Sequence, residues 1–349
     1  MPSKLSVRIA AAALGAVTVF AVTPTAADAT TDAKPSPAGA GVTVKMPTEV
    51  ANALGTSRGA LVDAVAADAL GRSQAGRGLA PSVALGKLAG EGRKVVVDVR
   101  SATAGWARGV AYVEAPATEG AHPEGWLYIA RYTDGHWVSG VEGDQEFAEY
   151  VGASPLVGAA ERQSITAYAN HQTMTTAANT GGLLLPWMPN YYMTVTGGPH
   201  AWDGVNGYWS SLDLAGGNAS GRVRSSRDGT ATSMCGAGGG WTRVIHPNGF
   251  STDYYHMYNA TYYNATPVAT SALLGTIGRD VCAGGSATGD HVHWGLRTYD
   301  ANYNGTYTWL HGRTIGGWTW WNGSSQYTGC ATRLGVTACP GTAIYNRTS

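Results

Sequence analysis

The sequence predicts a mainly β domain of antiparallel strands, preceded by a small α+β domain. After Gly181 the chain is dense in glycine, aromatic residues and short β-like runs, and it shows no long apolar helix period. Before Val157, one stretch with helical apolar spacing precedes three stretches that alternate like strands. The two halves of the chain therefore belong to different fold classes.

The N-terminus has the pattern of a signal peptide. Lys4 and Arg8 form a basic start, Ile9–Val22 is an apolar run, and Ala27-Asp28-Ala29 is a small-x-small cleavage site. The apolar run is short for a bilayer span and no later stretch is long enough, so a membrane anchor is the weaker alternative. We expect residues 1–29 to be a signal peptide and the mature protein to be secreted and extracellular, with no membrane span.

A small α+β domain is expected from Val50 to about Val157. Val50–Arg72 has helix-like apolar spacing. The expected strands are Lys94–Arg100, Trp106–Glu114 and Trp126–Val138, the last with a hairpin turn at Asp134-Gly135. No group in this domain has the spacing of metal ligands or of a nucleophile with its base. We interpret the domain as a propeptide.

A connector and a second set of strands follow. Ala159–Gly182 is polar and rich in Thr, Ala and Asn, which is typical of a linker that contains a processing site. Thr242–His246 and Phe250–Met257 flank Pro247-Asn248-Gly249, a hairpin signal, and Asp290–Arg297 has the pattern of another strand.

Charge is distributed unevenly along the chain. The 23 basic and 23 acidic residues cancel, which argues against a nucleic-acid-binding protein. Glu161 is the last glutamate and Lys94 the last lysine, so the charged side chains beyond Gly181 are nine Arg and seven Asp. The same half holds nine of the 12 Trp, 13 of the 18 Tyr and all four Cys, which marks two units of different character. Any acid–base catalyst in the second unit is therefore not a glutamate.

The four cysteines are Cys235, Cys282, Cys330 and Cys339. An even count in an exported chain indicates two disulfides, for which three connectivities are open. Pairing of sequence neighbours favours Cys330–Cys339 together with Cys235–Cys282. A cysteine-rich zinc site is the alternative, but no two cysteines have the close C-x-x-C spacing of such sites.

His291-Val292-His293 is the strongest local signal for chemistry. Residues two apart on a strand share a face, so both imidazoles point the same way while Val292, Trp294 and Leu296 take the opposite, packed face. Such a pair can bind a divalent metal, or one imidazole can bind it while the other transfers protons. Alone, the pattern describes two exposed strand histidines equally well.

Three further residues strengthen the metal hypothesis. His200 lies thirteen positions before Asp213, and His256 ends the predicted hairpin strand. A catalytic zinc takes three protein ligands of N or O type and keeps one position open for water. His200, Asp213 and His293 would supply the three ligands. His256 and His291 would then face the water, and a histidine is the natural proton acceptor where no glutamate is present.

These motifs resemble the lysostaphin-type zinc peptidases, in particular their beta-lytic and staphylolysin branch. The resemblance runs from about Leu184 to the C-terminus. Its motifs are the His200–Asp213 interval, Val244-Ile245-His246-Pro247-Asn248-Gly249, Asp253-Tyr254-Tyr255-His256-Met257, Cys282-Ala283-Gly284-Gly285-Ser286-Ala287-Thr288-Gly289 and Gly289-Asp290-His291-Val292-His293-Trp294.

The resemblance implies one zinc ion per catalytic domain, bound by His200, Asp213 and His293, with His256 and His291 as the catalytic imidazoles. It also implies a tyrosine hydroxyl that helps to hold the oxyanion, for which Tyr327 is the candidate; the alternative is an ordinary loop aromatic residue. The fold implied for this half is a twisted antiparallel sheet with a loop-walled groove.

The function that the resemblance implies is that of a secreted, monomeric zinc endopeptidase that cuts glycine-containing peptides in peptidoglycan. Residues 30–176 would then be an inhibitory propeptide and residues 177–349 the enzyme. Three alternatives stay open: a D,D-carboxypeptidase or amidase of the same zinc family, a non-catalytic cell-wall-binding module, and a broader protease that degrades elastin-like glycine-rich proteins.

Overall fold

The computed structural model describes residues 41–170, 180–204, 207–218, 220–299 and 305–348. The expected signal peptide at residues 1–29 and the expected mature N-terminus near Ala177 lie outside these ranges. Pro37–Ser349 forms one compact unit. None of the helices within the described ranges is long and apolar enough to cross a membrane.

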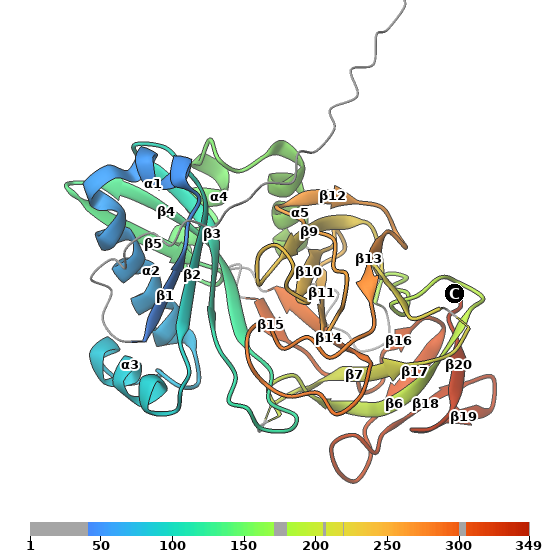
Figure 1. Cartoon of the computed structure of the whole chain (residues 1–349). Coiled ribbons are helices and arrows are strands. Elements are labelled where there is room, and N and C mark those ends of the chain that lie inside the picture. Colours follow the sequence, from blue (N-terminus) through green and yellow to red (C-terminus); the bar gives the residue numbers. More distant parts are fainter. Residues whose placement is uncertain (1–40, 171–179, 205–206, 219, 300–304, 349) are drawn as a thin grey trace, which may run out of the picture. The chain divides into compact units, whose positions relative to one another are not determined.

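The N-terminal half is an α+β structure whose sheet has the strand order β1-β2-β3-β4-β5 (Figure 1). Strand β1 pairs with β2 in parallel, and the remaining pairs are antiparallel. The elements are β1 Val42–Lys45, α1 Thr48–Leu54, a 3₁₀ turn at Gly55–Ser57, α2 Arg58–Arg72, α3 Pro81–Gly90, β2 Val95–Ala102, β3 Trp106–Val113, β4 Glu124–Thr133, β5 His136–Val141, α4 Gln145–Ala153 and α5 Ala159–Asn170.

The sequence pattern of this half is largely confirmed, with two corrections. The single helix expected over Val50–Arg72 is broken at Gly55, which has a positive φ of 55° that glycine tolerates at low cost. The connector expected from Ala159 is wrong for its first part, because Ala159–Asn170 is helix α5. The reason is tertiary: Ile165 of this helix is buried in a hydrophobic cluster with Ile245 of the other half.

The C-terminal half is confirmed as mainly β, since the elements of its described residues are all strands (Figure 1). Its largest sheet has nine strands in the order β12-β9-β10-β11-β14-β7-β6-β20, with β15 paired to β14. The strands of this sheet are β6 Tyr192–Ala201, β7 Trp209–Ala215, β9 Gly229–Ser233, β10 Thr242–Ile245, β11 Phe250–Tyr255, β12 Thr266–Val268, β14 Val292–Tyr299, β15 Gly305–Tyr307 and β20 Ala343–Tyr345.

Two smaller antiparallel sheets complete this half. One pairs β8 Arg222–Arg224 with β13 Leu273–Thr276, and the other joins β16 Thr314–Ile315, β17 Trp318–Trp321, β18 Cys330–Arg333 and β19 Val336–Ala338. The predicted hairpin at Pro247-Asn248-Gly249 joins β10 to β11, with Gly249 at a φ of 84°.

Strand β14 carries the apolar alternation that the sequence predicts. Val292, Trp294 and Leu296 are fully buried in one hydrophobic core, so the side chain of His293 emerges from the other face of the sheet. This strand pairs with β11 on one side and with β7 on the other. Polar residues of β7 and β11 therefore lie next to this strand.

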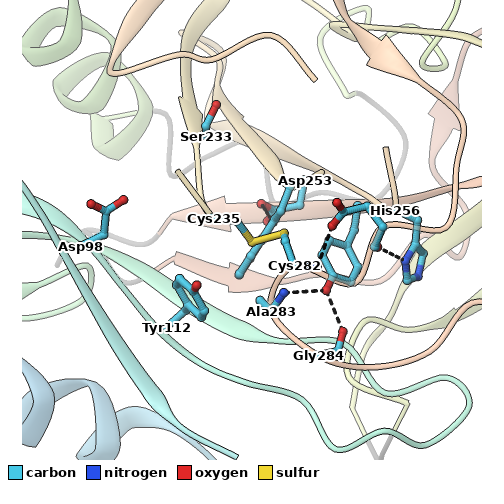
Figure 2. The surroundings of a disulfide bond; sticks show 12 residues. Asp98, Tyr112, Ser233, Cys235, Asp253, His256, Cys282, Ala283 and Gly284 are labelled. Atoms are coloured by element: carbon cyan, nitrogen blue, oxygen red, sulfur yellow. Dashed lines mark hydrogen bonds between the residues drawn. A yellow bond between two sulfur atoms is a disulfide. The ribbon is translucent and has the colours of Figure 1, made fainter. Parts of the chain in front are cut away.

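Two disulfides, Cys235–Cys282 and Cys330–Cys339, join the cysteine pairs that sequence proximity favours. Figure 2 shows the first of them, with Ala283 and Gly284 following Cys282 on one loop. The hydroxyl of Tyr255 donates to the Gly284 carbonyl over 2.7 Å and accepts from the Ala283 N–H over 3.1 Å. The bridge and these bonds fix the loop next to the end of β11.

Removing either disulfide should destabilise the protein according to the length of the loop that it closes. Cys235–Cys282 spans 47 residues and Cys330–Cys339 spans 9, for which loop-closure entropy predicts about 4 and about 3 kcal/mol. Urea unfolding followed by tryptophan fluorescence should therefore rank wild type above the Cys330→Ala/Cys339→Ala chain, and that chain above Cys235→Ala/Cys282→Ala. A larger loss from the short loop would contradict this ranking.

Candidate metal centre

Three polar side chains converge where strands β6, β7 and β14 lie side by side. They are His200, Asp213 and His293, and their ligand atoms lie within 4.8 Å of one another. The Nδ1 of His293 is 2.9 Å from Asp213 Oδ1 and 3.2 Å from His200 Nε2, and His200 Nε2 is 3.6 Å from Asp213 Oδ1. Both histidines are fully buried and Asp213 is half-buried.

Strand register explains why these three residues meet. Asp213 on β7 is directly opposite His293 on β14, so the two side chains project from the same face of the sheet. The pairing of β6 with β7 shifts register between Gly197 and His200. These irregularities change the direction of the chain and bring His200, which pairs with Ser211, toward the same point.

The donor set fits a metal ion. The Nδ1–H of His200 donates to the Gly198 carbonyl over 2.7 Å, which leaves a lone pair at Nε2. That lone pair and the Asp213 carboxylate are both acceptors, and a cation between them removes their repulsion. Ligand atoms of a tetrahedral zinc site, each about 2.1 Å from the ion, lie about 3.4 Å from one another. The observed separations of 2.9, 3.2 and 3.6 Å bracket that value.

The protonation states of these groups suit ligation. Burial lowers the pKa of His200, and it lowers the pKa of His293 to about 3. Burial alone would raise the pKa of Asp213, but the imidazoles of His200 and His293 outweigh it and hold that pKa below its usual range. At neutral pH the site therefore presents two neutral imidazoles and one carboxylate.

Two further imidazoles, those of His256 and His291, stand beside the cluster. His256 follows the last residue of β11 and has a positive φ of 67°. Its Nδ1–H donates to the Asp280 carbonyl over 2.8 Å, and the Nδ1–H of His291 donates to the Gly289 carbonyl over 2.8 Å. Both rings therefore offer a lone pair at Nε2. The two ring centroids are 4.8 Å apart, and His291 Nε2 is 3.6 Å from Asp213 Oδ1.

Tyr327 also reaches this region from a loop before β18. Its ring stacks on His200 with centroids 3.9 Å apart, and its carbonyl accepts a hydrogen bond from Gly198 N–H over 2.9 Å. Burial raises the pKa of the Tyr327 hydroxyl, and the nearby carboxylate of Asp213 adds to the effect. The hydroxyl is therefore a neutral hydrogen-bond donor at every physiological pH.

Two other features of the sequence have structural roles. His246 is buried between the Asp228 carbonyl and the hydroxyl of Thr252, away from the cluster. Four tryptophans follow Tyr307. Trp318 and Trp320 are buried core residues, whereas Trp309 and Trp321 are exposed.

Sequence reasoning missed one residue of this region, His122 of the N-terminal half. Its Nε2 is 3.1 Å from His256 Nε2, and its ring stacks on His293 with centroids 3.5 Å apart and an interplanar angle of 3°. Burial lowers its pKa well below the ordinary histidine value, and His293 and His256 add to the effect. No ligand spacing could have found it, because His256 lies 134 positions further along the chain.

The chain resembles known proteins over part of its length. Over 161 residues it is 32% identical to the beta-lytic metalloendopeptidase of Lysobacter enzymogenes, a match that covers 42% of this chain and 85% of that protein. The chain belongs to the lysostaphin-type family of metallopeptidases. Membership makes it a metallopeptidase with a metal cofactor, in agreement with the His–Asp–His cluster.

The chain is also similar to other known proteins. The chain is 31% identical over 180 residues to Protease LasA of Pseudomonas aeruginosa, covering 46% of this chain and 40% of the length of that relative. It is 31% identical to the solved structure of pseudoalterin, described as a novel M23 metalloprotease from the deep sea; that match covers 48% of this chain and 99% of the other, with a TM-score of 0.42. No protein-family model matches the chain.

The metal content of variants should distinguish the three candidate ligands, His200, Asp213 and His293, from the two neighbouring imidazoles, His256 and His291. If these residues hold the metal, replacing His200, Asp213 or His293 by Ala should remove or weaken it, because each change deletes one of three candidate ligands. His256→Ala and His291→Ala should keep near-stoichiometric metal, since neither side chain is needed for ligation.

Elemental analysis of purified full-length variants measures this, after circular dichroism has shown that each is folded. His291 and His293 form the matched pair, because they are two positions apart beside the same strand. Loss of metal from His291→Ala with retention in His293→Ala would reverse the assignment.

Proposed function

We propose that this metallopeptidase is the precursor of a secreted zinc endopeptidase that hydrolyses glycine-containing peptide bonds in bacterial peptidoglycan cross-bridges. Residues 1–29 act as the signal peptide, residues 30–176 as an inhibitory propeptide, and residues 177–349 as the enzyme. The active species is a monomer that binds one zinc ion through His200, Asp213 and His293.

One observation carries this proposal: three ligand atoms converge beside two imidazoles whose Nδ1–H groups are already bound to backbone carbonyls. These hydrogen bonds fix the orientation of each ring and keep a lone pair, the kind of group that can accept a proton, at its Nε2. A module that only binds the cell wall does not require proton acceptors, even if it holds a metal ion. Two imidazoles held in a fixed orientation are therefore not expected in such a module. The arrangement therefore favours hydrolysis over binding alone.

A zinc ion on these ligands supplies polarisation of the scissile carbonyl and lowers the pKa of a water to about 7. His256 or His291 accepts the proton of the attacking water at Nε2 and passes it to the leaving amine. The other imidazole and the Tyr327 hydroxyl stand beside the developing oxyanion, to which the hydroxyl can donate a hydrogen bond. Neither base needs a carboxylate partner, in keeping with the lack of glutamate after Glu161.

The substrate class is tested with the processed protein on three materials. Purified Gram-positive walls and pentaglycine should both be hydrolysed, with new amino termini on glycine, whereas elastin measures how far the preference extends to other glycine-rich proteins. Release of free D-alanine would indicate a carboxypeptidase instead, and release of whole stem peptides an amidase. Binding to the walls without any released product would contradict the proposal that the protein is an enzyme.

Activity should fall on acidification. Burial lowers the pKa of His256 to about 4 in the precursor, and His291 adds to the effect. A protonated imidazole cannot accept a proton, so kcat/KM should be constant through neutral pH and decline below the pKa of the base. Removal of the N-terminal half would expose His256, so burial would lower this pKa less in the processed protein than in the precursor.

A pH–rate profile of the processed protein on pentaglycine measures this decline in kcat/KM at acidic pH. Metal content must be determined at each pH, so that loss of the ion is not mistaken for protonation of the base. A maximum near pH 4 with metal retained would contradict an imidazole base and favour an aspartate.

A further inference from the structure

The connection between β3 and β4 in the N-terminal half, residues 114–123, runs across the candidate site. The N–H of Ala115 donates to the Ala283 carbonyl over 2.9 Å, and Ala115 forms a parallel bridge with Gly284. At the other end of the segment, the indole N–H of Trp202 donates to the Pro123 carbonyl over 2.8 Å. Hydrogen bonds to its backbone thus hold the segment at both ends, and between them the chain turns at Glu119-Gly120.

Glycines of the C-terminal half receive the backbone of this segment. A Cβ added to Gly284, Gly204 or Gly285 would come closer than 3.0 Å to the carbonyl oxygens of Ala115, Gly120 and Ala121, respectively. Real side chains do not make such contacts, so only glycine leaves room for these carbonyls. Three separate glycines therefore shape the surface to a peptide backbone rather than to side chains.

Glycine is also required at one position of the segment itself. Gly120 has a positive φ of 74°, and a Cβ there would lie 2.7 Å from the Tyr327 hydroxyl. Gly120 therefore occupies the space beside the Tyr327 hydroxyl, the group that we propose as hydrogen-bond donor to the oxyanion. A glycine in that position matches the preference proposed for the substrate.

His122 of the same segment contacts the candidate catalytic residue His256. The Nε2 of His256 carries a lone pair, because its Nδ1–H is bound to the Asp280 carbonyl, so the 3.1 Å contact requires His122 to donate its Nε2–H. The lone pair that would accept the proton of water is therefore occupied. The ring of His122 is 6% exposed and covers the face of His293, and its Nδ1 has no hydrogen-bond partner in the described part of the chain.

We infer that residues 114–123 act as an internal pseudosubstrate: the segment fills the peptide-binding groove with a glycine beside Tyr327 and a histidine on the lone pair of His256. This inference rests on the function proposed above and deepens it, since it names the part of the propeptide that inhibits. It also implies that cleavage of the connector is not sufficient for activation. The N-terminal half must leave the groove or be degraded.

Contacts outside the segment hold the N-terminal half in place. Glu142, which is buried, pairs with Arg243 of β10 over 2.6 Å. The Nζ of Lys45 donates to the Cys235 carbonyl over 2.8 Å, at the disulfide shown in Figure 2. These contacts keep the segment next to the groove after the connector is cut, so a nicked complex should stay inactive.

Two variants of the intact chain test the inference, each with a matched control. Gly120→Ala places a methyl group against Tyr327, and Gly135→Ala makes the same change at a φ of 81° with no atom within 4 Å. His122→Ala frees the lone pair of His256, and His136→Ala removes an exposed histidine of the same half. Each chain is purified uncleaved, and its mass is verified before and after the assay.

Hydrogen exchange and hydrolysis of a quenched pentaglycine peptide are then measured on all five chains. In wild type the amides of residues 114–123 should be protected, and Gly120→Ala and His122→Ala should release them while β2–β5 stay protected. Activity of an intact chain scales with the fraction whose groove is free, so each variant should gain about tenfold or more over intact wild type. Both controls should match wild type.

The outcomes distinguish this inference from the proposed function. If the processed wild-type enzyme cuts pentaglycine but the intact variants stay as inactive as intact wild type despite a released segment, the segment is not the inhibitor. Equal, fast exchange of residues 114–123 in wild type and variants would also overturn the inference. If the processed enzyme cuts no glycine peptide, the proposed function fails, whatever the exchange data report on the segment.

Discussion

The pairing of β14 with β7 is the constraint on which the rest of this site depends. It sets His293 directly opposite Asp213, at the 2.9 Å separation of their ligand atoms. The opposite face of β14 is locked by Val292, Trp294 and Leu296, which are fully buried in the core. A slip of one residue in this register would turn the imidazole into the core and expose the apolar residues, so core packing and metal ligation specify the same register.

Three imidazoles of this site are oriented by backbone carbonyls rather than by side chains. Carbonyls of Gly198, Asp280 and Gly289 accept the Nδ1–H of His200, His256 and His291, respectively. A carbonyl can only accept, so it fixes the tautomer as well as the orientation of each ring. The Asp280 carbonyl lies two residues before Cys282, so the Cys235–Cys282 disulfide restrains the loop on which the geometry of His256 depends.

Arg243 has a carboxylate partner in each of the two halves of the chain. Arg243 is buried between Glu142 of the N-terminal half and Asp253 of β11, which accepts from its guanidinium over 3.1 Å. Asp253 also accepts from the indole N–H of Trp241 and from the hydroxyl of Tyr307. Without Glu142, Arg243 would therefore keep a paired carboxylate within the C-terminal half.

Most local elements, and the chemistry expected of the second half, follow from the amino-acid sequence alone. The His291-Val292-His293 alternation, the hairpin at Pro247-Asn248-Gly249 and the two cysteine pairs follow from periodicity, turn chemistry and spacing, which are short-range properties. The family motifs added His200, Asp213 and His256. The helix at Ala159–Asn170 depends instead on tertiary contacts, because Ile165 acquires buried partners from the other half. The same holds for His122: its contact with His256 joins residues 134 positions apart through the docking of two domains, and no pattern within either domain encodes a contact that exists only when both are folded.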